Sequence, residues 1–275
     1  MGILICGHQR SGTTILAQLC NSHPEILLTN EFGPYFHLDE SRPAFSYHLL
    51  QRWWRAGNRS LILPQKEIGA KVSGDLTPRQ GGNGRLRVLP GLRMTLRLLK
   101  VLRPNAGGII GPAELEAGFQ RVFPLTRFTG DKHPDYIFWM EKLSSIPGLT
   151  CLVMLRDPRD VISSSIRAYQ DKWNKWWPDK MIDPGQVALR WKKIVAVIDR
   201  CADKIHLINY EHLIDDPAHT AVKLGGLLDL DPRKFRVSLV KPGSIGKYRQ
   251  MLSPAVEEQI LDLVAPEMRR FGYLS

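Results

Sequence analysis

The chain has 275 residues, of which 43% are hydrophobic and 24% charged, and it carries a formal net charge of +11. A chain of this length and composition folds as a globular protein with a sizeable core. No stretch approaches the roughly 20 apolar residues of a membrane span. Zinc-finger spacing, aromatic RNA-binding signatures and heptad arrays are also absent from the sequence, so the charge is a weak indication of nucleic-acid binding, and we expect none.

The cysteines and the first residues bear on location. The four cysteines lie in or beside apolar runs and lack the spacing of metal ligands, which is typical of buried thiols in a reducing compartment. The apolar run Ile3 to Cys6 has neither a basic region before it nor the length of a signal peptide. We therefore expect a cytoplasmic protein without a transmembrane segment. Peripheral contact with a membrane is an alternative that the sequence does not decide.

The first predicted unit is a strand, a glycine turn and a helix. Ile3 to Cys6 forms a short buried strand, and apolar residues recur at helical spacing from Ile15 until His23-Pro24 ends the helix. Between them, GHQRSGTT keeps the Gly-x-x-x-x-Gly frame of a phosphate-binding P-loop, but Thr13 stands where the lysine is expected. Backbone N–H groups in such a turn bind tetrahedral oxyanions. The missing lysine indicates a ligand without a β,γ-phosphate pair and its bridging magnesium, and we expect no metal site.

Residues 37–125 interrupt the alternation of strands and helices, and we expect them to form an irregular or partly helical insertion. No acidic residue occurs between Asp75 and Glu114, and seven cations gather there: Arg79, Arg85, Arg87, Arg93, Arg97, Lys100 and Arg103. Residues 91–103 predict a basic amphipathic helix with an apolar stripe of Leu92, Leu96, Leu99 and Leu102. This helix either packs on the domain with a solvated basic face, or forms a lid over an acceptor site together with Trp173, Trp176 and Trp177.

A second strand and helix unit follows the insertion. Cys151 to Leu155 predicts a strand that Arg156 follows directly, and Ser164 lies eight residues later on the next helix. A guanidinium and a hydroxyl so placed can surround one further phosphate. A third strand is expected at Ile205 to Ile208. The alternation predicts an α/β, P-loop-like, three-layer fold with a central parallel sheet, as a single domain over residues 1–275.

Together the two anion-binding motifs resemble those of the sulfotransferases that use 3′-phosphoadenosine-5′-phosphosulfate (PAPS). Arg10-Ser11-Gly12-Thr13-Thr14 is similar to their 5′-phosphosulfate loop, and Arg156 with Ser164 is similar to their 3′-phosphate pair. The resemblance covers roughly residues 1–36 and 126–275. It implies PAPS as the donor, 3′-phosphoadenosine-5′-phosphate as the product, and no metal.

Two later segments extend the resemblance. The segment that starts at Tyr210 resembles the family's Tyr-Glu-Asp-Leu segment, and residues 241–249 resemble its Gly-x-x-Gly segment, which closes over the nucleotide. The resemblance therefore implies cofactor contacts at Tyr210, Lys241, Gly243, Ser244 and Lys247. Pro242 departs from the cytosolic branch, which has lysine at this position.

The catalytic base has several candidates. Transfer to a hydroxyl needs a base and cations for the developing negative charge, and the chain offers Glu31, His133 and His8 as bases. Glu31 lies 21 residues after Arg10, as in the tyrosylprotein branch, and is our choice. Lys132-His133-Pro134 is one residue short of the cytosolic pattern, in which a histidine is the base. In either branch Lys132 fits as a transition-state cation, beside Arg10.

Three functions fit these observations to different degrees. The best supported is a PAPS-dependent sulfotransferase that acts by in-line displacement on a hydroxyl-bearing acceptor, of anionic or amphiphilic character if the basic helix is a lid. The alternatives are a metal-dependent nucleotide kinase with a degenerate P-loop and a non-catalytic basic protein that binds anions. The sequence does not identify the acceptor or the oligomeric state.

Overall fold

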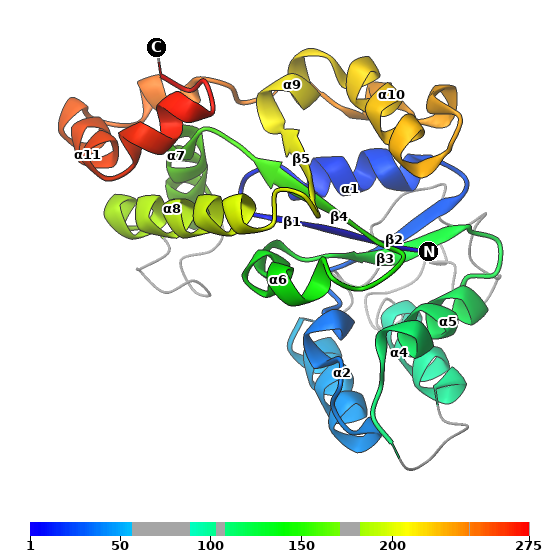
Figure 1. Cartoon of the computed structure of the whole chain (residues 1–275). Helices are drawn as coiled ribbons and strands as arrows, with labels where there is room; N and C mark the ends of the chain where they lie inside the picture. The colour runs from blue at the N-terminus through cyan, green and yellow to red at the C-terminus, as the bar shows by residue number, and fades with distance from the viewer. Residues whose placement is uncertain (57–88, 103–107, 171–181, 242, 275) are drawn as a thin grey trace.

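A central parallel sheet organises the computed structural model, which describes residues 1–56, 89–102, 108–170, 182–241 and 243–274 (Figure 1). The sheet has five strands in the order β2-β3-β1-β4-β5. All four strand pairings are parallel, so the carboxyl ends of the strands share one edge. The strands are β1 (Gly2–Gly7), β2 (Ile26–Asn30), β3 (Phe128–Lys132), β4 (Leu149–Leu155) and β5 (His206–Asn209).

Helices cover both faces of this sheet, which confirms the predicted three-layer α/β fold (Figure 1). On one face lie α1 (Thr13–Ser22), α9 (Tyr210–Asp215) and α10 (Pro217–Leu228). On the other lie α2 (Arg42–Ala56), α4 (Leu89–Val101), α5 (Pro112–Val122) and α6 (Met140–Leu143). The helices α7 (Pro158–Ala168), α8 (Pro184–Arg200) and α11 (Pro254–Arg270) pack together beyond β4, and short 3₁₀ helices include η1 (Pro34–His37) and η4 (Pro134–Trp139).

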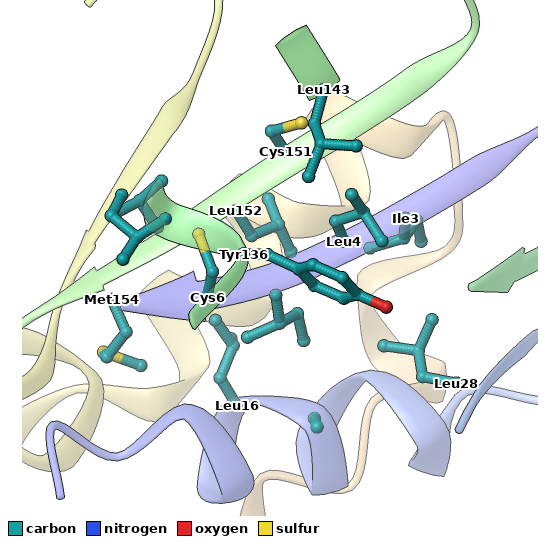
Figure 2. Packing of buried hydrophobic residues seen from close by; sticks show 14 of the residues in the cluster. Ile3, Leu4, Cys6, Leu16, Leu28, Tyr136, Leu143, Cys151, Leu152 and Met154 are labelled. Carbon is teal, nitrogen blue, oxygen red and sulfur yellow. The ribbon is translucent and has the colours of Figure 1, made fainter. Parts of the chain in front are cut away.

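The core lies on both sides of β1. Ile3, Leu4 and Cys6 are fully buried against Leu152 and Met154 of β4 (Figure 2). A central parallel strand with helices on both faces is buried on both sides, which explains its continuous apolar run. All four cysteines are buried and free, as expected. No helix in the described part of the chain is long and apolar enough to cross a membrane.

Two strands were missing from the sequence prediction. β2 and β3 pair with each other, with Asn30 opposite Lys132, and β3 reads FTGDK. Buried strands were predicted from apolar runs, whereas β3 buries the polar residues Thr129, Asp131 and Lys132. The polar side chains are tolerated because they find partners inside the protein: the Thr29 hydroxyl donates to Asp131 Oδ1 at 2.7 Å.

The predicted basic helix exists as α4, with a rotated apolar stripe. Leu99 and Leu102 are buried as predicted, but Leu96 is 50% exposed and Leu98 is buried instead. The rotation follows from packing on α5, where a Cβ added at Gly118 would lie 2.9 Å from Leu102 and 3.1 Å from Leu98. Several residues of these predictions lie outside the described residues: Arg103, Trp173, Trp176 and Trp177 of the lid hypothesis, and Arg79, Arg85 and Arg87 of the basic segment.

Candidate functional site

The glycine loop between β1 and α1 has the backbone that its sequence requires. Gly7 has φ 144° and Gly12 has φ 97°. A Cβ at Gly7 would lie 2.3 Å from the carbonyl oxygen of Met154, and one at Gly12 would lie 2.4 Å from the Tyr210 ring. Both positions therefore need glycine. Gly12 gives α1 no side-chain cap, so the first N–H groups of the helix are left for an external acceptor.

Ser11 stabilises the loop from within. Its hydroxyl donates to the carbonyl oxygen of His8 at 2.6 Å, and its N–H donates to the same oxygen at 3.1 Å. The Ser11 side chain is fully buried, so it holds the shape of the loop rather than offering a hydroxyl at the surface. After Gly12 come Thr13 and Thr14, the first residues of α1.

Arg10 joins the loop to the second predicted anion-binding motif. Its Nε donates to Ser164 Oγ at 3.1 Å, and its carbonyl oxygen accepts a hydrogen bond from Arg156 Nη1 at 2.9 Å. The two motifs lie 146 residues apart in sequence. The structure brings them together because β1 and β4 are neighbours in the sheet and end at the same edge.

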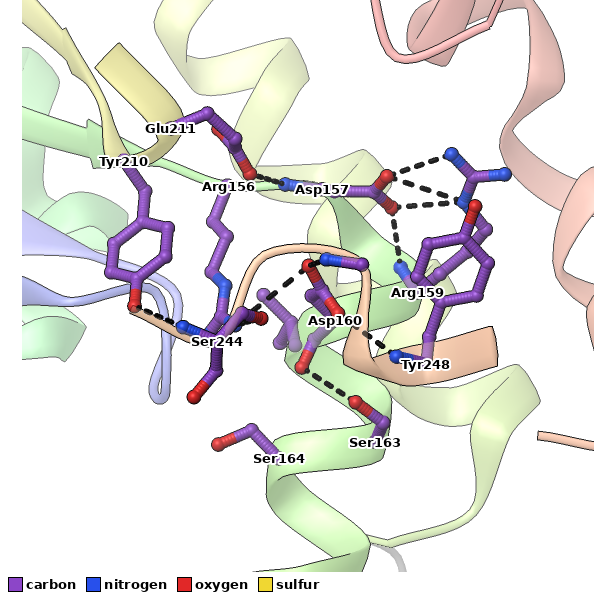
Figure 3. A network of polar contacts seen from close by, with 12 residues as sticks. Arg156, Asp157, Arg159, Asp160, Ser163, Ser164, Tyr210, Glu211, Ser244 and Tyr248 are labelled. Carbon is purple, nitrogen blue, oxygen red and sulfur yellow. Dashed lines mark hydrogen bonds and ion pairs between the residues drawn. The ribbon is translucent and has the colours of Figure 1, made fainter. Parts of the chain in front are cut away.

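Arg156 is held on several sides (Figure 3). It is only 4% exposed, its guanidinium lies 4.2 Å from the centroid of the Tyr210 ring, and its Nη2 donates to the Ser244 carbonyl oxygen at 2.7 Å. Its Nε is shielded from solvent and has no hydrogen-bond partner among the described residues. A buried guanidinium with a free donor is a ready anion ligand.

The carboxyl-terminal segment, residues 241–249, packs against this arginine. Asp160 accepts hydrogen bonds from Gly246 N at 2.7 Å and Tyr248 N at 3.1 Å. A Cβ at Gly243 would lie 2.8 Å from the hydroxyl of Tyr210, so the segment packs closely on that ring. Lys241 is exposed and Lys247 is half-buried at the two ends of the turn, while Pro242 lies outside the described residues.

The Arg159 side chain has a structural role. Asp157 caps α7 by accepting from Arg159 N at 2.8 Å, and it also binds the Arg159 guanidinium at 2.8 Å (Figure 3). The same guanidinium donates to Glu257 Oε1 and to the Tyr273 carbonyl oxygen. Arg159 thereby ties α7 to α11 and to the residues that follow it.

A second pair of polar residues lies where β2 and β3 end. Lys132 Nζ donates to Glu31 Oε1 at 2.8 Å, and Glu31 N donates to the Lys132 carbonyl oxygen at 2.6 Å. The Lys132 side chain is 2% exposed, while that of Glu31 is 40% exposed. The lysine is therefore fixed in the interior, and the carboxylate reaches solvent, where an incoming hydroxyl could meet it.

Asp131 fixes the loop that presents Glu31, and the sequence analysis missed it. Its carboxylate is buried and accepts from Thr29, from Tyr136 and from the backbone N–H groups of Phe32 and Gly33. The last two residues directly follow Glu31. Burial raises the pKa of Asp131, and these hydrogen bonds oppose that rise. Four converging donors match the ionised carboxylate.

The two histidine candidates, His133 and His8, have surroundings that differ from those of Glu31. His133 Nδ1 accepts from Asp135 N at 3.1 Å, and its Nε2 faces the Arg52 guanidinium. Burial, with the charges of Arg52 and Lys132, lowers the pKa of His133 to about 2. Burial also lowers the pKa of His8 to about 4. Both ring nitrogens of His133 thus face N–H groups of the protein, whereas the Glu31 carboxylate reaches solvent.

Arg52 was a second residue that the sequence did not reveal. Besides facing His133, it donates from Nε to the Glu31 carbonyl oxygen at 2.6 Å. It comes from α2, in the segment that the family resemblance did not cover, and no motif surrounds it. Its role becomes visible only when α2 is placed against the end of β2.

The parallel five-strand sheet with a glycine turn between β1 and α1 defines a P-loop-like α/β protein. Residues 111–233 match the model of the sulfotransferase family. No curated protein sequence matches the chain significantly.

Three solved structures share the fold. A sulfotransferase domain from the olefin synthase of Synechococcus PCC 7002 has a TM-score of 0.59 at 17% identity, covering 97% of this chain and 93% of that one. A sulfotransferase domain from the curacin biosynthetic pathway gives 0.54 at 15% identity, covering 96% of each chain. Sulfotransferase STF9 from Mycobacterium avium gives 0.52 at 12% identity, covering 98% of this chain and 76% of that one. The family-model match confirms the predicted resemblance to the sulfotransferase family, and the solved structures confirm the fold.

Proposed function

We propose that this protein is a PAPS-dependent sulfotransferase that acts on an acceptor hydroxyl. The observation that carries the proposal is the contact of Arg10 with both motifs: it belongs to the glycine loop and binds Ser164 and Arg156. Two adjacent oxyanion sites suit a donor that carries phosphate at both ends of an adenosine.

The residues present fit such a donor. The uncapped start of α1, with Arg10 and the backbone of residues 11–14, would hold the 5′-phosphosulfate. Arg156 and Ser164 would hold the 3′-phosphate, with the unpartnered Nε of Arg156 as a free donor. Tyr210 would add a contact, as would the closing segment with Lys241, Gly243, Ser244 and Lys247. When bound, PAPS supplies a sulfuryl group activated for in-line displacement by an acceptor oxygen.

Glu31 is the proposed base, because its carboxylate reaches solvent. Its backbone is fixed by hydrogen bonds to Lys132 and Arg52. Glu31 takes the acceptor's hydroxyl proton at the carboxylate oxygen. Lys132 and Arg10 place positive charge beside the reacting groups, where it stabilises negative charge that develops on the leaving phosphate. His133 is a poor alternative since Arg52 faces its Nε2.

The acceptor side is proposed to lie on α2, α4 and α5, the described part of the insertion at residues 37–125, within a single domain. This side of the sheet carries Arg52, which touches the Glu31 backbone. Arg93 and Lys100 are exposed on α4, which favours an anionic or amphiphilic acceptor. The kinase alternative is weaker because Thr13 replaces the P-loop lysine, and a simple anion-binding protein would not need the Glu31 and Lys132 pair.

Calorimetry with two nucleotides tests the proposal without knowledge of the acceptor. A charge-assisted phosphate contact is worth about 1.5–3 kcal/mol, so 3′,5′-ADP should bind on the order of tenfold to a hundredfold more tightly than 5′-AMP. Equal affinities would refute the assignment of Arg156 and Ser164 to a 3′-phosphate. Tighter binding of ATP in the presence of Mg²⁺ than of 3′,5′-ADP would favour the kinase.

A further inference from the structure

Three side chains outside the proposed reaction site converge where η1 meets α2. They are His37 at the end of η1, Glu40 in the following turn, and His48 in α2. His37 Nδ1 lies 3.0 Å from Glu40 Oε1, and His48 Nε2 lies 3.6 Å from Glu40 Oε2. One ligand atom from each of the three lies within 4.8 Å of the others, and none of the three has a role in the proposed sulfotransfer.

We propose that His37, Glu40 and His48 form a binding site for a divalent transition-metal ion of the zinc type. Two imidazoles and one carboxylate are a common donor set for zinc, with bonds of about 2.0–2.2 Å. Tetrahedral bonds of that length separate two ligand atoms by about 3.4 Å. The His37 nitrogen lies 3.0 Å from one oxygen of the Glu40 carboxylate and the His48 nitrogen 3.6 Å from the other, and each separation is close to this value.

The contacts within the cluster leave a place for an ion. The 3.6 Å between His48 Nε2 and Glu40 Oε2 is too long for a hydrogen bond. Glu40 Oε2 is shielded from solvent and has no hydrogen-bond partner among the described residues. The two imidazole rings are parallel, with an interplanar angle of 2° and centroids 4.4 Å apart, so both can face the same carboxylate. The half-exposed side chains leave access for water as a fourth ligand.

The backbone around the cluster is already fixed. Glu40 N donates to the His37 carbonyl oxygen, and the Glu40 carbonyl oxygen accepts from Ile110 N at 3.0 Å. Asp39 N donates to the Ile110 carbonyl oxygen at 2.9 Å, and the Asp39 side chain is paired with Lys142. A turn held on both sides loses little freedom when it binds an ion, which favours binding.

The position of the site gives the ion a structural role. η1 begins three residues after Glu31, and Arg52 lies one helical turn beyond His48 on α2. An ion bound by His37 and His48 would therefore join the two elements that flank Glu31. It would stay outside the reaction, for which we expect no metal.

Direct metal binding tests the proposal independently of sulfotransfer. The full chain, without a histidine tag, is stripped with EDTA, dialysed, and titrated with Zn²⁺ by calorimetry and with Co²⁺ by visible absorption. We expect one ion per chain. His37→Ala and His48→Ala should each weaken Zn²⁺ binding by at least about tenfold, since even second-shell changes cost 10–100-fold at metal sites. Glu40→Gln, which keeps the side chain's shape, should do the same.

The matched control is His219→Ala, which removes an exposed histidine on α10 and should bind as the unchanged protein does. Binding of one ion that is lost in the three cluster variants and kept in the control supports the site. The absence of binding at about 100 μM metal, a weak affinity for a structural ion, would overturn it and leave an ordinary ion-paired cluster. Binding that the cluster variants do not change would also overturn it.

Discussion

Replacement of Arg156 by alanine separates the proposed nucleotide site from a generally basic surface. The guanidinium donates to two backbone carbonyl oxygens, of Arg10 at 2.9 Å and of Ser244 at 2.7 Å, and stacks on Tyr210. Its loss removes one charge-assisted phosphate contact, worth about 1.5–3 kcal/mol, so 3′,5′-ADP binding should weaken on the order of tenfold to a hundredfold. Binding of 5′-AMP should change much less, because it lacks the 3′-phosphate.

Isothermal calorimetry measures both affinities, and circular dichroism checks that the variant is folded. Arg156→Lys keeps the charge but cannot reproduce the two-pronged contact, so it should recover only part of the affinity. Arg200→Ala is the matched control, because this arginine is exposed at the end of α8 and pairs with Glu141. A folded Arg156→Ala protein that still prefers 3′,5′-ADP over 5′-AMP as the unchanged protein does would refute the assignment.

Three further predictions concern the base, the histidine and the basic helix. Glu31→Gln should lower kcat about 10²- to 10⁴-fold with nucleotide affinity nearly unchanged, and His133→Ala should lower it far less; the reverse ranking would make His133 the base. The pKa of His133 is lowered from 6.5 to about 2 in the folded protein. As pH falls, His133 therefore takes up a proton in the unfolded chain before it does so in the folded chain. The free energy of unfolding, measured by urea denaturation, should therefore drop from pH 7 to pH 5 by about 2 kcal/mol more in the unchanged protein than in His133→Gln. Equal drops would contradict a buried, neutral His133. Changing Arg93, Arg97 and Lys100 together to glutamine should raise KM for the acceptor, weaken its salt dependence and leave 3′,5′-ADP binding unchanged; unaltered acceptor kinetics would show that the charge is solvated surface.

The sequence predicted the parts of the fold that depend on local pattern. β1, β4 and β5 are apolar runs, and the turn from Gly7 to Gly12 carries the glycines that its geometry needs. The pairing of that turn with Arg156 was also predictable, because the ends of parallel strands share one edge. These features need only short stretches of sequence and a rule of sheet geometry.

The missed features depend on contacts between distant segments. β3 escaped detection because its buried polar side chains become acceptable only beside β2, where Asp131 meets four donors. Arg52 likewise has no local signal, since its partners lie 21 and 81 residues away. The contact between Arg52 and His133, which bears on the choice of Glu31 over His133, is likewise visible only in the folded chain.

Transfer of labelled sulfate is the most direct test of the central proposal. The protein is incubated with sulfur-labelled PAPS and an extract of host metabolites in magnesium-free buffer, and labelled products are identified by mass spectrometry. The proposal predicts a labelled hydroxyl compound, formed with release of 3′,5′-ADP and strongly reduced with Glu31→Gln. No labelled product from an extract rich in hydroxyl compounds, together with phosphate transfer from ATP when magnesium is restored, would contradict it.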